Sequence, residues 1–188
     1  MMSLALVLTV PPVSAVAPCT LVFCAPGYPG DTEEAQPTMD ALAAGLAQAA
    51  GWPADSLSAV YHQNGEAGLE RLGREDAALA MVTLPFYLRH RAELELEPVL
   101  AGVPAGGGDM TWSLVAADGA LSGPEDLDGW TVTGLPAYYP GLVTGPVLSG
   151  WGRLPQSAEV RYGARALSSL RKASRGDPVA VLLDRAQV

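Results

Sequence analysis

Basic residues are scarce in this sequence of 188 residues. It contains 11 Lys and Arg against 20 Asp and Glu, which gives a formal net charge of −9 at pH 7. Nucleic-acid binding depends mainly on the neutralisation of phosphates by Lys and Arg, and no local run of basic residues offsets the deficit. The charge balance therefore argues against a nucleic-acid partner.

Cysteine and histidine are rare as well, with two of each. Their spacing matches no metal site, and the glycine-containing loop at 26–30 is neither a G-x-G-x-x-G motif nor a P-loop. We therefore expect no metal and no other cofactor. A disulfide between Cys19 and Cys24 would close across four intervening residues of one extended segment, which is geometrically awkward. Cys24 fits better as a small buried residue at the end of a strand.

Long apolar runs are absent too, and a membrane-spanning helix needs about 20 apolar residues. The short apolar run 4–10 is followed by Ala15 and Ala17 in an A-x-A arrangement. This pattern predicts a secretory signal over residues 1–17, although no Lys or Arg precedes the run. The alternative is a buried N-terminal strand. A signal would place the protein in the periplasm or otherwise outside the cytoplasm.

Charged residues as a class make up only 16% of the chain, whereas hydrophobic residues make up 49%. Disordered chains show the opposite balance, so we expect a folded chain with a sizeable core. The length of the chain fits one large domain or two small lobes.

The first half of the chain alternates between strand and helix patterns. Strands are predicted at 20–25, 57–62, 76–84 and 96–101. The longest helix between them begins with Asp31 and Glu34 in a capping arrangement and ends at Gly51. The near-continuous apolar run 76–84 is typical of a strand covered on both faces. Alternation of this kind predicts a parallel α/β sheet.

The pattern restarts after residues 103–109, which contain three consecutive glycines and are predicted to form a hinge or crossover. Further strands are predicted at 111–116, 130–134, 158–162 and 179–183. We therefore expect lobe 1 at 18–102 and lobe 2 at 110–188, each of the α/β class.

Several passages, taken in order, carry a family resemblance. The first runs from the strand at Leu21 through the Pro-Gly loop to the helix at Leu46, and the second is the strand that ends in Tyr61. The third spans 76–87, and the fourth spans 112–132 with its Gly-Pro-Glu-Asp-Leu turn. The order resembles the type 2 periplasmic solute-binding proteins, in particular the phosphate-, phosphite- and phosphonate-binding (PhnD-like) group.

The resemblance implies a two-lobed α/β fold with mixed, mainly parallel sheets flanked by helices. It also implies a monomer that is not an enzyme and that captures a small ligand in the cleft between the lobes by hinge closure. Such a protein delivers its ligand to the permease of an ABC transporter. Two alternatives stay open: a ligand-sensing module of a signalling system, and an enzyme on the same fold.

The sequence departs from the family pattern at two places. Where the phosphonate binders have a Ser/Thr-rich motif, this chain has 137–141 (AYYPG), so a phosphonate ligand is not carried over. The family chains also cross back into the first lobe, and this chain ends at Val188 soon after the last predicted strand. We therefore expect the return to lobe 1 to be missing.

Ligands of open α/β sheets bind outside the carboxyl ends of the strands. The residues predicted to bind the ligand lie at or after the carboxyl ends of the predicted strands and are Gly27, Tyr28, Pro29, Gly30, Tyr61, His62, Leu84, Pro85, Phe86, Tyr138 and Tyr139. Backbone N–H groups at the helix starts near Asp31 and Pro140 would favour an anionic group. We expect a small organic ligand with a carboxylate or a ring.

Each of these residues also has a structural interpretation. His62 fits an ordinary strand end, and the tyrosines fit the packing of a lid. His90, between Arg89 and Arg91, is expected on the solvent surface. The basic cluster formed by Arg165, Arg171, Lys172 and Arg175 is expected to be an exposed helix face, with a permease-docking surface as the alternative.

Overall fold

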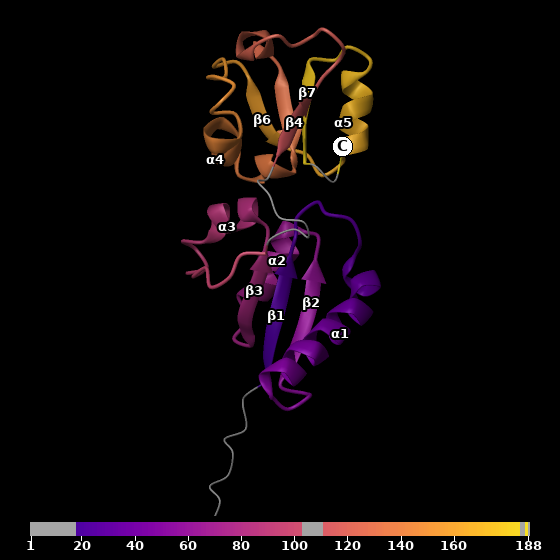
Figure 1. Ribbon diagram of the computed structural model, residues 1–188, viewed down its shortest axis with the longest axis vertical. Helices are drawn as coiled ribbons and strands as arrows, with labels where there is room; N and C mark the ends of the chain where they lie inside the picture. The colour runs from indigo at the N-terminus through magenta and orange to yellow at the C-terminus, as the bar shows by residue number, and fades with distance from the viewer. Residues whose placement is uncertain (1–17, 103–110, 185–186, 188) are drawn as a thin grey trace, which may run out of the picture.

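The computed structural model describes residues 18–102, 111–184 and 187 (Figure 1). The described strands form two separate sheets, with strand orders β2-β1-β3 and β4-β7-β5-β6. We call residues 18–102, which hold the first sheet, lobe 1, and residues 111–184, which hold the second, lobe 2. The expected signal at 1–17 and the expected hinge at 103–109 lie outside the described residues, so the division at those boundaries stays a prediction.

Lobe 1 is a parallel sheet with helices on its faces. It comprises β1 (Cys19–Cys24), α1 (Thr32–Ala50), β2 (Leu57–His62), α2 (Gly65–Leu72), β3 (Ala77–Val82) and α3 (Leu84–His90). Both β2 and β3 pair with β1 in parallel. The apolar stripe of α1, which includes Met39 and Ala43, packs over β2 against Leu57 and Tyr61.

The capping arrangement predicted for the longest helix is confirmed. The Asp31 carboxylate accepts a hydrogen bond from the Glu34 backbone N–H at 2.8 Å, which satisfies one of the donors left free in the first turn. The helix ends at Gly51, whose φ of 68° lies in the left-handed region that glycine adopts most readily.

Lobe 2 has shorter elements around a mixed sheet. It comprises β4 (Trp112–Val115), η1 (Pro124–Leu127), β5 (Thr131–Gly134), η2 (Leu135–Tyr138), α4 (Pro140–Leu142), η3 (Val143–Val147), β6 (Glu159–Tyr162), α5 (Ala166–Ala173) and β7 (Val179–Asp184). Strands β5, β6 and β7 are parallel, whereas β4 is antiparallel to β7. The core of lobe 2 includes Leu127, Val132, Val143 and Leu182. The predicted α/β class with mainly parallel sheets is confirmed.

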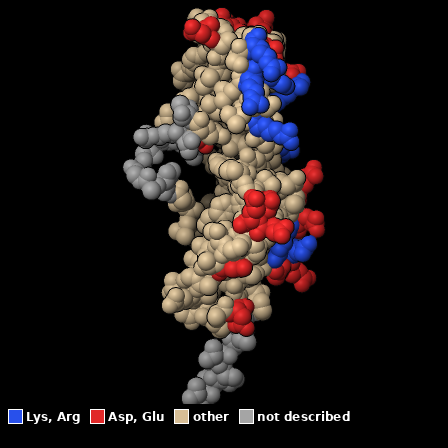
Figure 2. Space-filling model, turned by 90° about the vertical axis from the view of Figure 1, so that its right-hand side faces the viewer, with Lys and Arg blue, Asp and Glu red and all other residues tan. Residues whose placement is uncertain are grey.

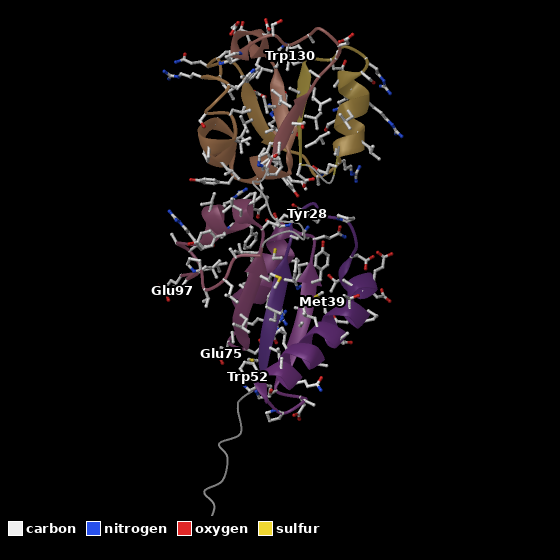
Figure 3. The ribbon with its side chains drawn as sticks, viewed as in Figure 1. Tyr28, Met39, Trp52, Glu75, Glu97 and Trp130 are labelled. Carbon is white, nitrogen blue, oxygen red and sulfur yellow. The ribbon has the colours of Figure 1, made fainter. Side chains whose placement is uncertain are left out.

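The carboxyl ends of the parallel strands in the two lobes face each other. Figure 3 places Tyr28, which follows β1, at the end of lobe 1 nearest lobe 2, and places Glu75, which precedes β3, toward the opposite end. Trp130, which precedes β5, lies at the end of lobe 2 far from lobe 1. The loops that follow β1, β3 and β5 therefore meet at the junction of the lobes.

The expectation that strand 76–84 is covered on both faces is wrong. β3 pairs only with β1 among the described strands, and Leu79 and Met81 are 44% and 46% exposed. The register pairs Leu79 with Leu21 and Met81 with Phe23, which places them on the α1 side of the sheet. Because α1 lies over β2, at the other edge of the sheet (Figure 1), it does not cover them.

The expected strand 96–101 is not formed either. These residues make no ladder in the described part of the chain, and Val99 and Leu100 are largely exposed. Pro98 lacks a backbone N–H and therefore weakens any ladder through this segment.

The basic cluster lies where the sequence predicts it. Arg165, Arg171, Lys172 and Arg175 are exposed in and around α5, and Lys and Arg gather on the upper part of the face in Figure 2. Whether this face docks on a partner stays a prediction. In the part of the chain that the structure describes, no helix is both long and apolar enough to cross a membrane.

Candidate ligand-binding pocket between the lobes

A pocket of about 160 Å³ lies at the junction of the lobes. Lobe 1 lines it with Pro26, Tyr28, Thr83, Leu84 and Pro85, and lobe 2 lines it with Trp112, Leu135, Pro136, Tyr138 and Leu142. Thr83 directly follows β3 and Leu135 directly follows β5. The pocket thus lies at the carboxyl ends of parallel strands, where open α/β sheets bind their ligands.

The loop after β1 forms a tight turn that brings its backbone against lobe 2. The Tyr28 N–H donates to the Ala25 carbonyl at 3.1 Å, and Gly27, with a φ of 80°, donates its N–H to the Gln63 carbonyl at 3.1 Å. A Cβ added at Gly27 would lie 2.5 Å from the Tyr162 hydroxyl and 2.6 Å from the Leu135 side chain. Glycine is therefore favoured here, because a Cβ would meet these two lobe 2 side chains and because a positive φ strains other residues.

On the lobe 2 side, β5 turns directly into the short helix η2. Gly134 makes the turn with a φ of 156°, and a Cβ added there would lie 2.5 Å from the Leu182 carbonyl oxygen. Leu135 and Pro136 are buried immediately after it. This anchoring fixes η2 and directs Tyr138, at its end, toward lobe 1.

Tyr138 makes the main described contact between the lobes. Its ring stacks on Phe86 of α3 with centroids 5.9 Å apart, and the Arg89 guanidinium lies 4.9 Å from the ring centroid. The Tyr138 hydroxyl lies 3.1 Å from His90 Nε2, and Arg89 donates a hydrogen bond to the Tyr138 carbonyl at 3.2 Å. Tyr162 packs edge-on against the same ring. The Tyr138 ring is therefore held between α3 of lobe 1 and Tyr162 of lobe 2.

His90 corrects a sequence-based expectation. It is only 8% exposed, although its position between two arginines suggests the solvent surface. Its ring lies 4.6 Å from that of Phe86, and its Nδ1 is 3.1 Å from a Glu93 carboxylate oxygen. The reason is tertiary, because lobe 2 packs against α3 and covers a residue that a lone helix would expose.

The structure brings four of the eleven predicted site residues into the pocket lining: Tyr28, Leu84, Pro85 and Tyr138. Phe86 is fully buried beneath Tyr138 and positions that ring instead of lining the space. Gly27 lies in the turn that touches lobe 2.

The other predicted residues lie outside the lining. Tyr61 is buried in the lobe 1 core, and its hydroxyl donates to the Pro29 carbonyl at 3.1 Å. His62 is half-buried beside α2, and burial is the main factor that lowers its pKa. Pro29, Gly30 and Tyr139 are exposed.

Sequence reasoning missed six of the lining residues: Pro26, Thr83, Trp112, Leu135, Pro136 and Leu142. Leu135 and Pro136 follow a predicted strand directly, so the rule that identified Tyr28 would also have found them. Trp112 carries no such signal because it opens its strand. It reaches the pocket since β4 runs antiparallel to β7, which pairs Trp112 with Asp184 at the carboxyl end of β7.

The chemistry of the lining is apolar with a few neutral polar groups. Tyr28, Thr83 and Tyr138 carry hydroxyls, and Trp112 carries an indole N–H. Burial raises the pKa of Tyr28 and of Tyr138, the first further through Asp184 and the second partly offset by Arg89. Both hydroxyls therefore stay protonated at neutral pH. No group of three His, Cys, Asp or Glu residues that could hold a metal occurs among the described residues.

The structure is similar to that of the periplasmic aliphatic sulphonate binding protein SsuA from Escherichia coli, with a TM-score of 0.50 and 15% sequence identity. The match covers 90% of this chain and 55% of that one, so this chain spans little more than half its length. The fold is that of the two-lobed periplasmic binding proteins. An ancestral arginine-binding protein bound to arginine also matches, with a TM-score of 0.42 and 14% identity over 89% of this chain and 71% of that chain. No protein-family model and no curated protein matches the sequence.

Proposed function

We propose that this protein is an extracytoplasmic solute-binding protein that captures a small molecule between its lobes for an ABC transporter. The observation that carries this proposal is the composition of the pocket wall, because each lobe supplies half of the lining residues. A site divided in this way is complete only when the lobes are together. It therefore couples ligand capture to the relative position of the lobes.

The contacts around the pocket support such a coupling. Tyr138 lines the pocket and also makes the stacking and hydrogen-bond contacts to α3. A ligand that touches Tyr138 and Leu84 would bridge the lobes beside these contacts and would favour the closed arrangement by mass action. The lobes at 18–102 and 110–188, with a hinge at 103–109, are part of this proposal.

The composition of the lining favours binding over catalysis. Catalysis by acid–base or nucleophilic chemistry depends on a group whose proton affinity is matched to the reaction. The described lining residues include no carboxylate, imidazole, thiol or amine, and burial raises the pKa of the two tyrosine hydroxyls further from neutrality. The fold similarity also supports a binding function, because the matched sulphonate protein is by name a binding protein.

A thermal-shift screen of the full chain tests this function. The panel should hold aliphatic sulphonates, amino acids including arginine, and uncharged ring compounds. We expect at least one compound to raise the unfolding temperature. A Leu84→Trp variant should lose that response, because Leu84 lines the pocket and, since it is 46% exposed, a larger side chain there fills the pocket without disrupting the core.

The matched control is Leu167→Trp on α5, where the side chain is 73% exposed and outside the lining. It should respond like the wild type. A response that survives Leu84→Trp, or a panel without any response, contradicts the proposed function.

A further inference from the structure

Building on the binding function proposed above, we infer that the pocket selects an uncharged, mainly apolar ligand about the size of one aromatic ring. The first reason is size. The pocket volume of about 160 Å³ is close to that of an engineered apolar cavity of about 150 Å³ that binds benzene. A ligand of six to eight non-hydrogen atoms, as a rough figure, fills such a space.

The second reason is the chemistry of the wall. Six of the ten lining residues are leucine or proline, and the other four are neutral residues with one polar group each. An ion that enters this space loses its hydration and meets no opposite charge in the lining, which is strongly unfavourable. A neutral ligand with one hydroxyl or carbonyl loses much less hydration free energy. The Thr83 and Tyr28 hydroxyls can also form hydrogen bonds with it.

The third reason concerns anions. The start of α1 is one of the helix N-termini expected to hold an anionic group. The positive end of its dipole is already compensated by the Asp31 carboxylate and by Glu33 and Glu34 in the first turn. Three carboxylates at this helix end repel a further anion. In the loop before it, the N–H groups of Gly27 and Tyr28 are already engaged with backbone carbonyls.

Residues 139 and 140 of lobe 2 offer an anion no free backbone donor. Pro140 has no N–H, and the Tyr139 N–H donates to the Pro136 carbonyl at 3.2 Å. These donors of the backbone cradle that the sequence suggests near Asp31 and Pro140 are thus engaged or absent on both sides of the junction.

Cations find no counter-charge in the lining either. The Arg89 guanidinium already lies over the ring of Tyr138 and would repel a second cation at that wall. Asp184 is close enough to raise the pKa of Tyr28, and its carboxylate accepts a hydrogen bond from the Gln187 N–H at 3.0 Å. Charges of both signs lie outside the wall: Arg89 and Asp184, and also Glu66 and Glu93, which raise the pKa of Tyr138. None of these charged groups lines the pocket.

The test uses three probes of matched shape and different charge: benzyl alcohol, benzoate and benzylammonium. Each is titrated into the full chain by NMR or calorimetry, with Leu84→Trp to block the pocket and Leu167→Trp as the control. We expect benzyl alcohol to bind at least about tenfold more tightly than either ion. That binding should be lost in Leu84→Trp and kept in Leu167→Trp.

The outcomes separate the two proposals. If either ion binds in the pocket as tightly as benzyl alcohol, the ligand class is overturned and the binding function stands. The same holds if none of the three probes binds while another compound of the screen gives a response that Leu84→Trp removes. If neither the probes nor the screen give a response, both proposals are overturned.

Discussion

Arg89 of lobe 1 holds Tyr138 of lobe 2 at two points, because its guanidinium lies 4.9 Å from the ring centroid and also donates to the backbone carbonyl at 3.2 Å. The contact joins α3 to η2 at the edge of the pocket. It fixes both the main chain and the ring of a lining residue, so it supports the pocket wall and the junction of the lobes together.

Arg89→Ala is expected to loosen the junction without unfolding either lobe. The loss of the cation–π contact should cost about 1 kcal/mol, which corresponds to about fivefold weaker ligand binding. Small-angle scattering should show a larger mean radius, and calorimetry should show the weaker affinity. Arg91→Ala is the matched control, because Arg91 lies over Tyr87 on the same lobe at 5.9 Å. Equal effects of the two variants would contradict the role given to Arg89.

Gly27→Ala should disturb the contact between the lobes, whereas Gly30→Ala should not. Both glycines have a positive φ, of 80° and 89°, so each substitution strains the backbone by about 1 to 2 kcal/mol. Only the new Cβ at Gly27 meets lobe 2, since nothing lies within 4 Å of a Cβ at Gly30. Urea unfolding should show a loss of stability in both variants. Ligand affinity should fall in Gly27→Ala alone, and an equal fall in Gly30→Ala would count against this inter-lobe contact.

The carboxyl group of Asp76 is expected to make the stability of the fold sensitive to acid. A bidentate hydrogen bond from Arg71, followed in size by one with Thr20, lowers the pKa of Asp76 from 3.8 to about 2. A carboxyl whose pKa is depressed in the folded state stabilises the fold above its unfolded pKa and loses that contribution as the pH falls through the folded value. Stability should therefore decline between about pH 4 and pH 2.

Asp76→Asn should flatten this part of the pH profile of urea unfolding. Glu70→Gln is the control, because Glu70 forms an exposed ion pair with Arg74 at 3.3 Å, a type of pair that contributes little. If the slope of the profile is unchanged in Asp76→Asn, the Arg71–Asp76 pair is not its source.

Cys24 should be inert toward thiol reagents. Burial raises its pKa to about 12, and only the thiolate is an effective nucleophile. In a Cys19→Ser variant, which leaves Cys24 as the sole thiol, labelling at pH 8 should be negligible in buffer and complete in urea. Rapid labelling of the folded variant would contradict this prediction and would mean that α2, whose Gly68 lies against the Cys24 sulfur, moves away readily.

The sequence predicts the local features of the fold well. The capping of α1 by Asp31 and its end at Gly51 depend on residues adjacent in the chain, so the pattern alone indicates them. Coverage of β3 is different, because it depends on which elements pack beside the strand. The sequence of an apolar strand does not reveal whether its side chains contact a helix or solvent. In this structure Leu79 is half-exposed.

The same distinction applies to the candidate pocket. Tyr28, Leu84 and Pro85 lie at or just after the carboxyl ends of predicted strands, so the geometry of a parallel sheet is enough to bring them to one edge. Trp112 and the burial of His90 depend on an antiparallel strand and on the approach of the second lobe. No spacing within the sequence carries that information.

The edge of β3 has a practical consequence for work on the protein in vitro. Its six residues carry no charge, no proline and two half-exposed apolar side chains, Leu79 and Met81, on an edge that no described strand occupies. Such an edge is a template for pairing with other chains. Concentration, more than temperature, should therefore limit the handling of samples, and a charged side chain at Met81 should extend the range over which the protein stays monodisperse.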